Sequence, residues 1–163
     1  AAVGYSGGVP MGGDLTNAPR GEAQQLLIHA AMDPLSGNLD RIQVVKGWVD
    51  ADGASHERVY DAAWSGDREP DSNGSLPPVG NTVDIETGLF ENTIGAAQLA
   101  TVWEDPDFDP SVPAVYYARV IEIPTPRWTA YEAVRFGVTM DPEVPMTTQE
   151  RAYTSPIWYT PGQ

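Results

Sequence analysis

From Gln24 onward, short segments rich in β-branched and aromatic residues alternate with turn-forming clusters such as DPLSGN, DADGAS and DPDFDPSVP. This spacing is typical of all-β sandwiches and barrels, and helical periodicity is almost absent. We therefore expect an all-β fold, an antiparallel β-sandwich of immunoglobulin-like or jelly-roll-like type with long loops. The strongest strand candidates are Gln25–Met32, Leu39–Val49, Glu57–Trp64, Ala97–Glu104, Ala114–Ile123 and Ala152–Tyr159.

Three of these segments carry further detail. Both faces of Ala114–Ile123 are largely apolar, which predicts a central strand. Gly47 lies inside a strand candidate, where a glycine marks a bulge or a close backbone approach. Because Pro156 has no backbone N–H, the last strand should be an edge strand or begin at Ile157.

One short helix is expected near residues 130–137. Thr129 and Glu132 have the spacing of a capping box, and Gly137 supplies a left-handed stop. A long connection, Ser65 to Ile94, carries turn residues almost continuously, and loops of this length are functional or wrapped on the surface. One or two weak strands are possible within TVDIETGLFENT, residues 82–93.

The length of 163 residues fits one domain. With 41% hydrophobic and 20% charged residues, the chain has the composition of a globular protein with a core. The opening stretch AAVGYSGGVPMGG shows no strand or helix periodicity. We therefore expect residues 1–15 to be a linker from a missing upstream domain, and residues 16–163 to form a single β-sandwich domain.

The charge balance limits the partners. Nine basic residues against 23 acidic ones give a net charge of −14, which would repel a nucleic-acid backbone and an anionic membrane. No apolar run approaches the roughly 18 residues that a membrane span needs, so no membrane insertion is expected.

The histidines and serines do not form a catalytic motif that the sequence shows. The chain has only His29 and His56, no H-x-H or H-E-x-x-H arrangement, and no G-x-S-x-G elbow. His29 alternates with apolar residues on a strand candidate, and His56 follows a turn, so both are expected to be paired or solvated. We expect no catalytic residue and no cofactor in this fragment.

Calcium is a more serious candidate than a catalytic metal or a nucleophile, because acidic residues, whose oxygens calcium prefers, cluster in loops. Asp105, Asp107 and Asp109 have D-x-D-x-D spacing, but the glycine and the glutamate of an EF-hand are absent. If the chain bound calcium, the favoured ligands would be Asp67, Glu69, Asp71 and Asn73 in the long connection. We expect no bound metal, and a solvated acidic loop held by its turns.

Exposed aromatic rings could instead bind sugars. Of five tryptophans, Trp48, Trp64, Trp103 and Trp158 lie in strand candidates and are expected to fill the interior, whereas Trp128 lies in the loop PTPRWT.

Seven sequence blocks carry a family resemblance that spans nearly the whole chain. They are GVPMGGDL (8–15), LDRIQVVKGW (39–48), AWSGDR (63–68), TIGAAQL (93–99), WEDPDFDP (103–110), YYARVIEIPTPRW (116–128) and QERAYTSPIWY (149–159). Their order and spacing resemble the carboxy-terminal region of a bacterial family of unknown function, whose full-length members resemble the polymerase-and-histidinol-phosphatase (PHP) metallohydrolases. The resemblance implies an upstream metal-binding barrel, none of whose ligand motifs is present here.

Two functions follow as alternatives. The first is a non-catalytic β-sandwich that packs on the upstream catalytic barrel of a metal-dependent hydrolase, or shapes the rim of its active site. Arg127 and Trp128 are the expected interdomain contacts, with the alternative that Trp128 caps the core and Arg127 pairs with a carboxylate. The second is a carbohydrate- or calcium-dependent binding module. An exposed sheet edge is also expected to allow self-association into a homo-oligomer.

Overall fold

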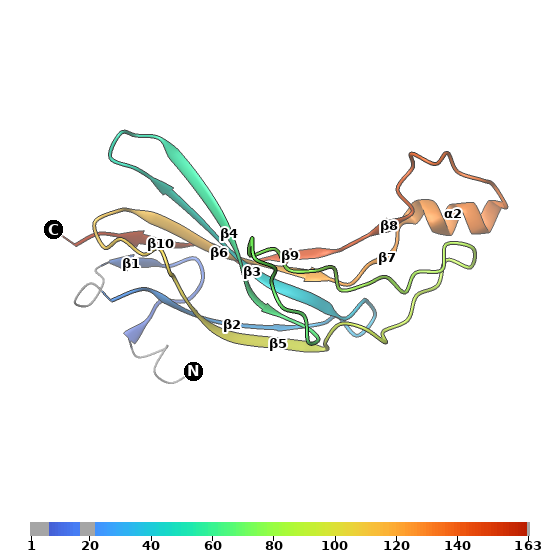
Figure 1. Ribbon diagram of the computed structural model, residues 1–163, viewed down its shortest axis with the longest axis horizontal. Helices are drawn as coiled ribbons and strands as arrows, with labels where there is room; N and C mark the ends of the chain where they lie inside the picture. Colours follow the sequence, from blue (N-terminus) through green and yellow to red (C-terminus); the bar gives the residue numbers. More distant parts are fainter. Residues whose placement is uncertain (1–6, 17–21, 163) are drawn as a thin grey trace.

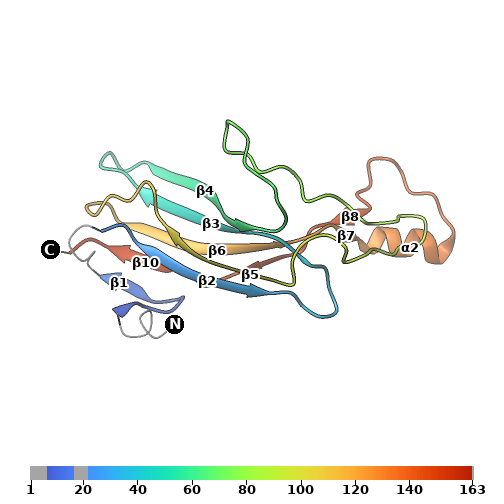
Figure 2. The ribbon, with the colours of Figure 1, turned by 60° about the horizontal axis from the view of Figure 1, so that its bottom comes forward.

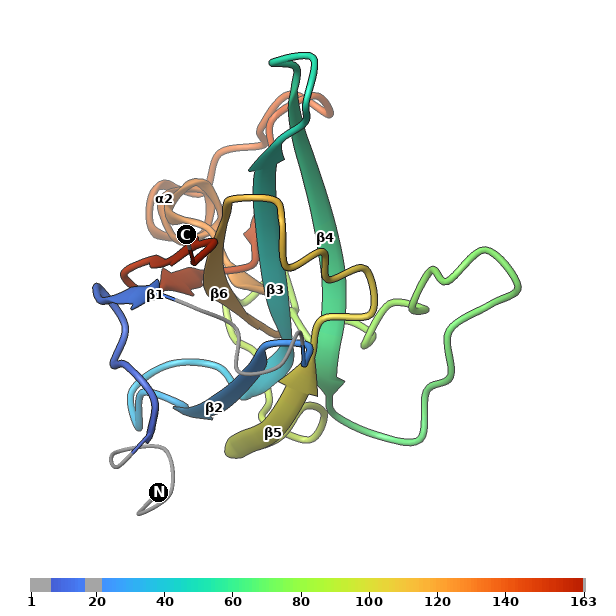
Figure 3. The same ribbon diagram turned by 90° about the vertical axis from the view of Figure 1, so that its left-hand side faces the viewer.

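The computed structural model describes residues 7–16 and 22–162 as an elongated, mostly β structure with one short helix, α2, at one end (Figure 1). A six-stranded sheet has the order β1-β10-β6-β3-β4, with β9 also paired to β6. Strands β2 and β5 form a second, two-stranded layer on one side of that sheet (Figure 3). Only β1 and β10 are parallel, and the fold is the expected antiparallel, sandwich-like all-β type.

The strands have these bounds: β1 Asp14–Thr16, β2 Gln25–Ala31, β3 Leu39–Val49, β4 Ser55–Trp64, β5 Gln98–Glu104, β6 Ala114–Glu122, β7 Thr125–Pro126, β8 Thr147–Thr148, β9 Arg151–Tyr153 and β10 Ile157–Thr160. The six predicted strands are confirmed, the last one as two pieces on either side of Pro156. β10 begins at Ile157, as the proline requires, and it is paired on both sides rather than lying at the edge. β1 includes Asp14 and Leu15, which the sequence assigns to the linker.

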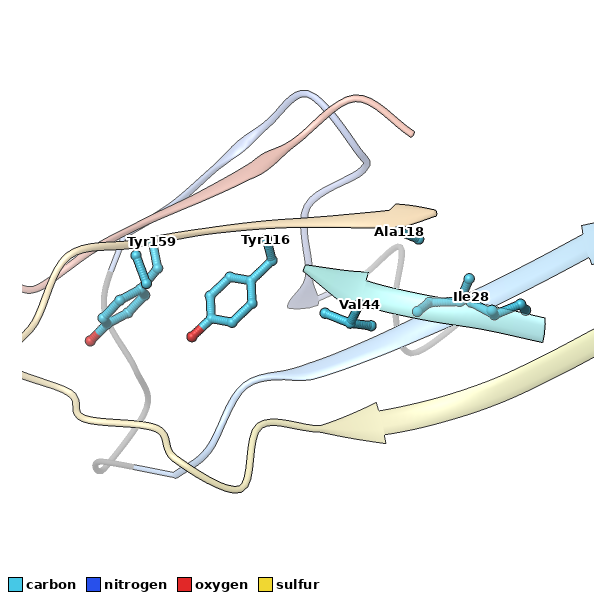
Figure 4. Close-up of a cluster of buried hydrophobic side chains, with 7 residues drawn as sticks. Ile28, Val44, Tyr116, Ala118 and Tyr159 are labelled. Carbon is cyan, nitrogen blue, oxygen red and sulfur yellow. The ribbon is translucent and has the colours of Figure 1, made fainter. Parts of the chain in front are cut away.

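The core lies between the two layers. Alternate residues of β3 and β6 point toward β2 and β5, so Ile42 and Val44 pack with Tyr116 and Ala118, and Ile28 of β2 closes the cluster (Figure 4). Burying an aliphatic side chain of this size contributes about 1.5–3 kcal/mol. The predicted central position of β6 is confirmed, since it lies between β3 on one side and β9 and β10 on the other.

Gly47 allows a close approach on the opposite side of β3. A Cβ atom there would lie 3.0 Å from Val115 Cγ1, and the strand register is continuous through this residue. Gly47 therefore marks no bulge, and the close neighbour is a side-chain carbon, since the nearest backbone atom that an added Cβ would meet is His56 O at 3.8 Å. The irregularities in register fall instead between Ile42 and Gln43 against β4, and between Leu39 and Arg41 against β6.

Helix α2 spans Trp128–Phe136 and ends at Gly137, whose φ of 62° is left-handed as predicted. The predicted capping box is wrong. Arg127 is the N-cap residue and makes no side-chain cap, while Thr129 is buried in the first turn, where its hydroxyl donates to Pro145 O at 2.5 Å. The hydroxyl therefore fastens the helix to the following loop instead of capping it.

The long connection, residues 65–94, is held to the sheet by Arg68. Its guanidinium donates to Asp40 Oδ1 at 2.7 Å, to Ser65 O at 3.0 Å and to Pro77 O at 2.9 Å. Leu76, a residue of this connection, is buried. The weak strands expected in residues 82–93 are reduced to a single bridge between Asp84 and Leu89.

Candidate functional site

Helix α2 and the turn at residues 84–89 lie together at the far end of the molecule (Figure 2). With Val138, two residues after the helix, they form an exposed apolar surface. We call this surface the distal tip. Its exposed apolar side chains are Ile85, Leu89, Trp128, Tyr131, Val134, Phe136 and Val138. These are seven of the 15 large hydrophobic residues that are exposed in the described part of the chain. Such a concentration of exposed apolar side chains is typical of an interaction site.

The distal tip is firmly built in spite of its exposure. A Cβ atom on Gly88 would lie 3.4 Å from Tyr131 Cδ1 and 3.6 Å from Val134 Cγ2, so the turn packs closely against the helix. On the other side of α2, Ala130 is fully buried and Arg127 N donates to Met146 O at 2.9 Å. The apolar side chains are therefore presented from a fixed backbone.

Arg127 and Trp128, the expected interdomain contacts, lie at the base of the distal tip. Trp128 is 60% exposed, so it does not cap the core. The Arg127 guanidinium lies 5.9 Å from the centre of the Trp128 ring, a cation–π distance, and Arg127 forms no ion pair with a described residue. The alternative interpretation of these two residues is therefore wrong on both counts.

The calcium candidates do not form a ligand cluster. Asp67, Glu69, Asp71 and Asn73 are exposed, and within residues 7–16 and 22–162 no three acidic or histidine side chains are placed to hold an ion. Asp71 instead holds its own turn, since its Oδ1 accepts from Asn73 N at 2.8 Å and from Ser75 N at 2.9 Å.

The D-x-D-x-D segment supplies three carboxylates with separate structural partners. Asp105 is buried and accepts from Lys46 Nζ at 2.6 Å and from Tyr116 Oη at 2.7 Å. Asp107 accepts from Arg58 and from Tyr60, at 2.8 and 2.7 Å. Asp109 accepts from the hydroxyl and the backbone N–H of Ser111, which hold its carboxyl pKa below the usual range. These contacts fix the loop between β5 and β6.

The cluster around Lys46 was missed by the sequence analysis. Lys46 and Asp105 are 59 residues apart, so no local motif joins them. The available signal was the position of Lys46 itself. It lies on the same inward face of β3 as Val44 and Trp48, two residues away on either side, and a lysine there needs a buried partner. Burial, followed by the hydrogen bond to the Asp105 carboxylate, raises the pKa of Tyr116 far above its ordinary value.

Both histidines make surface contacts. His29 lies at 3.4 Å from Gln98 Oε1, and His56 Nε2 lies 2.6 Å from Asp50 Oδ2 while its ring stacks on Trp48. The hydrogen bond with His56 makes the largest contribution to lowering the pKa of the exposed Asp50 carboxyl. Neither histidine lies beside a serine hydroxyl in a hydrogen-bonded pair within the described residues, so no nucleophile–base arrangement is formed there.

The tryptophans divide into two groups. Trp48, Trp64 and Trp103 are partly buried, as expected for strand positions. Trp158 is 52% exposed, so its predicted place in the interior is wrong. It lies on β10, at the opposite end of the molecule from Trp128, and the two rings cannot share one binding platform (Figure 1).

These features define an all-β, sandwich-like domain whose most exposed apolar surface lies at one end. No helix in the described part of the chain is long and apolar enough to cross a membrane. The chain matches a family described as "Protein of unknown function (DUF3604)" over residues 1–161, and it therefore belongs to this family. No curated protein and no solved structure matches it.

Proposed function

We propose that this chain is a non-catalytic accessory domain that packs through its distal tip on a catalytic domain located upstream in the same polypeptide. The observation that carries the proposal is the exposure of seven large apolar side chains on a fixed helix and turn. Apolar surface that is removed from water contributes about 25 cal/mol per Å². A partner that covers the distal tip would remove this apolar surface from water, and the contact would therefore stabilise both domains.

The family resemblance of the sequence blocks indicates which kind of catalytic domain the partner is. We propose an upstream metal-dependent hydrolase of the PHP type, acting on phosphoesters, with this domain stabilising the barrel or shaping the rim of its active site. Under this proposal the isolated domain hydrolyses no phosphoester. Turnover of p-nitrophenyl phosphate by the purified domain with manganese or zinc would contradict that part of the proposal.

The docking role is tested in the full-length polypeptide with Trp128→Ser combined with Tyr131→Ser. We expect faster proteolytic separation of the two domains and a lower melting temperature of the upstream domain, because these residues no longer exclude water from the contact. The control is Leu27→Ser combined with Val102→Ser, which removes two equally exposed apolar residues from the β2–β5 layer, away from the distal tip. Unchanged proteolysis and melting in the tip variant would overturn the docking role.

A further inference from the structure

A second surface of the domain has the chemistry of a sugar-binding face. It is the side of the six-stranded sheet turned away from β2 and β5, which we call the outer face, and no described strand covers it (Figure 3). Register places Trp158 opposite Val115 and Tyr153 opposite Arg119. Arg119 in turn lies opposite Gln43 on β3.

Three aromatic side chains run along the outer face. Trp158 is 52% exposed and Tyr153 is 59% exposed. Tyr117 lies on the neighbouring strand β6, between the residues that pair with Trp158 and Tyr153, and its ring centre is 6.3 Å from that of Tyr153. Val115, which pairs with Trp158, lies beside Gly47, where an added Cβ would be 3.0 Å from Val115 Cγ1. Ring faces carry partial negative charge, which attracts the polarised C–H groups of a pyranose ring.

A basic group adjoins these rings. Arg119 donates through Nε and Nη2 to Gln43 Oε1, at 2.9 and 2.6 Å. A guanidinium has five N–H groups, so three remain for another acceptor. Gln43 is itself oriented by its amide N–H, which donates to Asp61 at 2.7 Å.

Arg119 differs in its charge environment from the arginines that are paired with aspartates. In a protein of net charge −14, Arg41, Arg58 and Arg68 each form an ion pair with an aspartate. Arg119 forms none with a described residue, although it is only partly exposed. Arg151, exposed on β9 two residues before Tyr153, also forms none among the described residues. Positive charge without a carboxylate partner, beside exposed aromatic rings, complements an anionic ligand.

We propose that the outer face binds a sugar chain that carries carboxylates, with pyranose rings stacked on Trp158 and Tyr153 and a uronate carboxylate accepting from Arg119. This site is separate from the distal tip, so the sugar-binding proposal does not depend on the docking role.

The test is calorimetric titration of the intact chain with oligogalacturonate, and with cellohexaose as the neutral comparison. We expect saturable binding of oligogalacturonate that weakens with salt, and at least about tenfold weaker binding of cellohexaose. Trp158→Ala and Tyr153→Ala should each weaken binding about tenfold or more, and Arg119→Gln should abolish the preference for the acidic chain. Trp128→Ala, which removes the other exposed tryptophan, is the matched control and should leave binding unchanged.

Three outcomes would overturn the proposal. The first is an absence of saturable binding to oligogalacturonate, and the second is equal affinity for the neutral chain. The third is an equal loss of affinity in Trp128→Ala and Trp158→Ala. Tyr153 is exposed on a three-residue strand, so Tyr153→Ala keeps the test decisive if the Trp158 variant fails to fold.

Discussion

Lys46 Nζ and Asp105 Oδ2 lie 2.6 Å apart, and both side chains are almost fully removed from solvent between the two layers. Lys46 also donates to Asp107 O at 2.8 Å, so the pair connects the middle of β3 to the loop that follows β5. A charge buried without its partner is costly, because solvation by water is lost without a compensating interaction.

Asp105→Asn should therefore lower the free energy of unfolding by about 3–5 kcal/mol, since it leaves the Lys46 ammonium buried without a counter-charge. Urea unfolding followed by tryptophan fluorescence measures this change. Adding Lys46→Met to Asp105→Asn should restore much of the loss. If the double variant is as unstable as the sum of the two single variants, the two residues do not interact as described.

Gly95→Ala should be one of the most damaging small substitutions. Gly95 has a φ of 80°, and an added Cβ would lie 2.6 Å from Asn38 Cβ and 2.7 Å from Ile123 Cγ2. Gly53, with a φ of 82° and no atom within 4 Å, is the matched control. Gly53→Ala should cost about 1–2 kcal/mol from backbone strain alone, and Gly95→Ala about 1–3 kcal/mol more from the clash. Equal unfolding midpoints for the two variants would show that the site around Gly95 has room to relax.

Stability should fall as the pH rises through about 10. Burial raises the pKa of Tyr60 and of Tyr116 above the ordinary value of 10.0, and the nearby Asp107 and Asp105 carboxylates add to the effect. Both phenols thus stay neutral in the folded state after they would ionise in the unfolded chain. Their contribution is complete below pH 10 and is lost above it.

Urea midpoints measured from about pH 8 to about pH 11, with tyrosinate absorbance recorded in parallel, test this dependence. Tyr60→Phe combined with Tyr116→Phe should give a shallower fall over the same range. A fall of the same steepness in this variant would assign the pH dependence to other groups.

The turn at Asp71 should need no calcium. Asp71→Ala removes two hydrogen bonds to backbone N–H groups and should cost about 1 kcal/mol in an exposed loop. The melting temperature of the native chain should be the same in calcium and in a chelator. Asp67→Ala, also in the exposed loop, is the control. A rise of several degrees in calcium that Asp71→Ala abolishes would contradict this prediction.

Self-association should proceed through β2. Next to β2, Met32 N donates to Ala97 O, and Gln24 O accepts from Asp105 N, so the backbone groups of the even-numbered residues face β5. By alternation, the backbone groups of Leu27, His29 and Ala31 point to the free edge of β2. None of the seven residues of β2 carries a formal charge, whereas the long edge strand β4 has several charged residues. An open, uncharged edge of this length readily accepts another strand.

Because the net charge of −14 opposes the contact, association measured by sedimentation should strengthen from about 0.05 to about 0.5 M salt. Leu27→Glu should prevent it by placing like charges across the new pair of strands. Val102→Glu, the cross-strand neighbour on β5, should have little effect. A monomer at every salt concentration would rule out this edge as an interface.

Much of the fold could be predicted because residues such as Ile42, Val44, Tyr116 and Ala118 alternate along long strands that each bury one face. β1 could not, because its three residues are stabilised by pairing with a strand more than 140 positions away. The capping box failed at Thr129 because a carbonyl from the following loop competes for its hydroxyl.

The candidate sites show the same division between local and distant information. The sequence predicts Trp128 in the loop PTPRWT, with an exposed position and a core-capping position both open; the structure places it at the first residue of α2, where it is 60% exposed. For Trp158, alternation along β10 separates the two sides of the strand but does not say which side a second layer covers. The pairing of Arg119 with Gln43 likewise depends on tertiary contact between β6 and β3.

β1 and the distal tip lie at opposite ends of the molecule, and this separation limits how an upstream domain can be attached (Figure 1). β6 alone has nine residues, which span roughly 30 Å at about 3.3 Å per residue. A polypeptide that arrives through β1 is tethered at one end of this span, while the proposed contact lies at the other. The domain would then act as a strut, and the effective concentration of its tip at the partner would depend on the tether. A tether of fewer than about nine extended residues could not bridge that span, so shortening it should separate the domains without altering any contact residue.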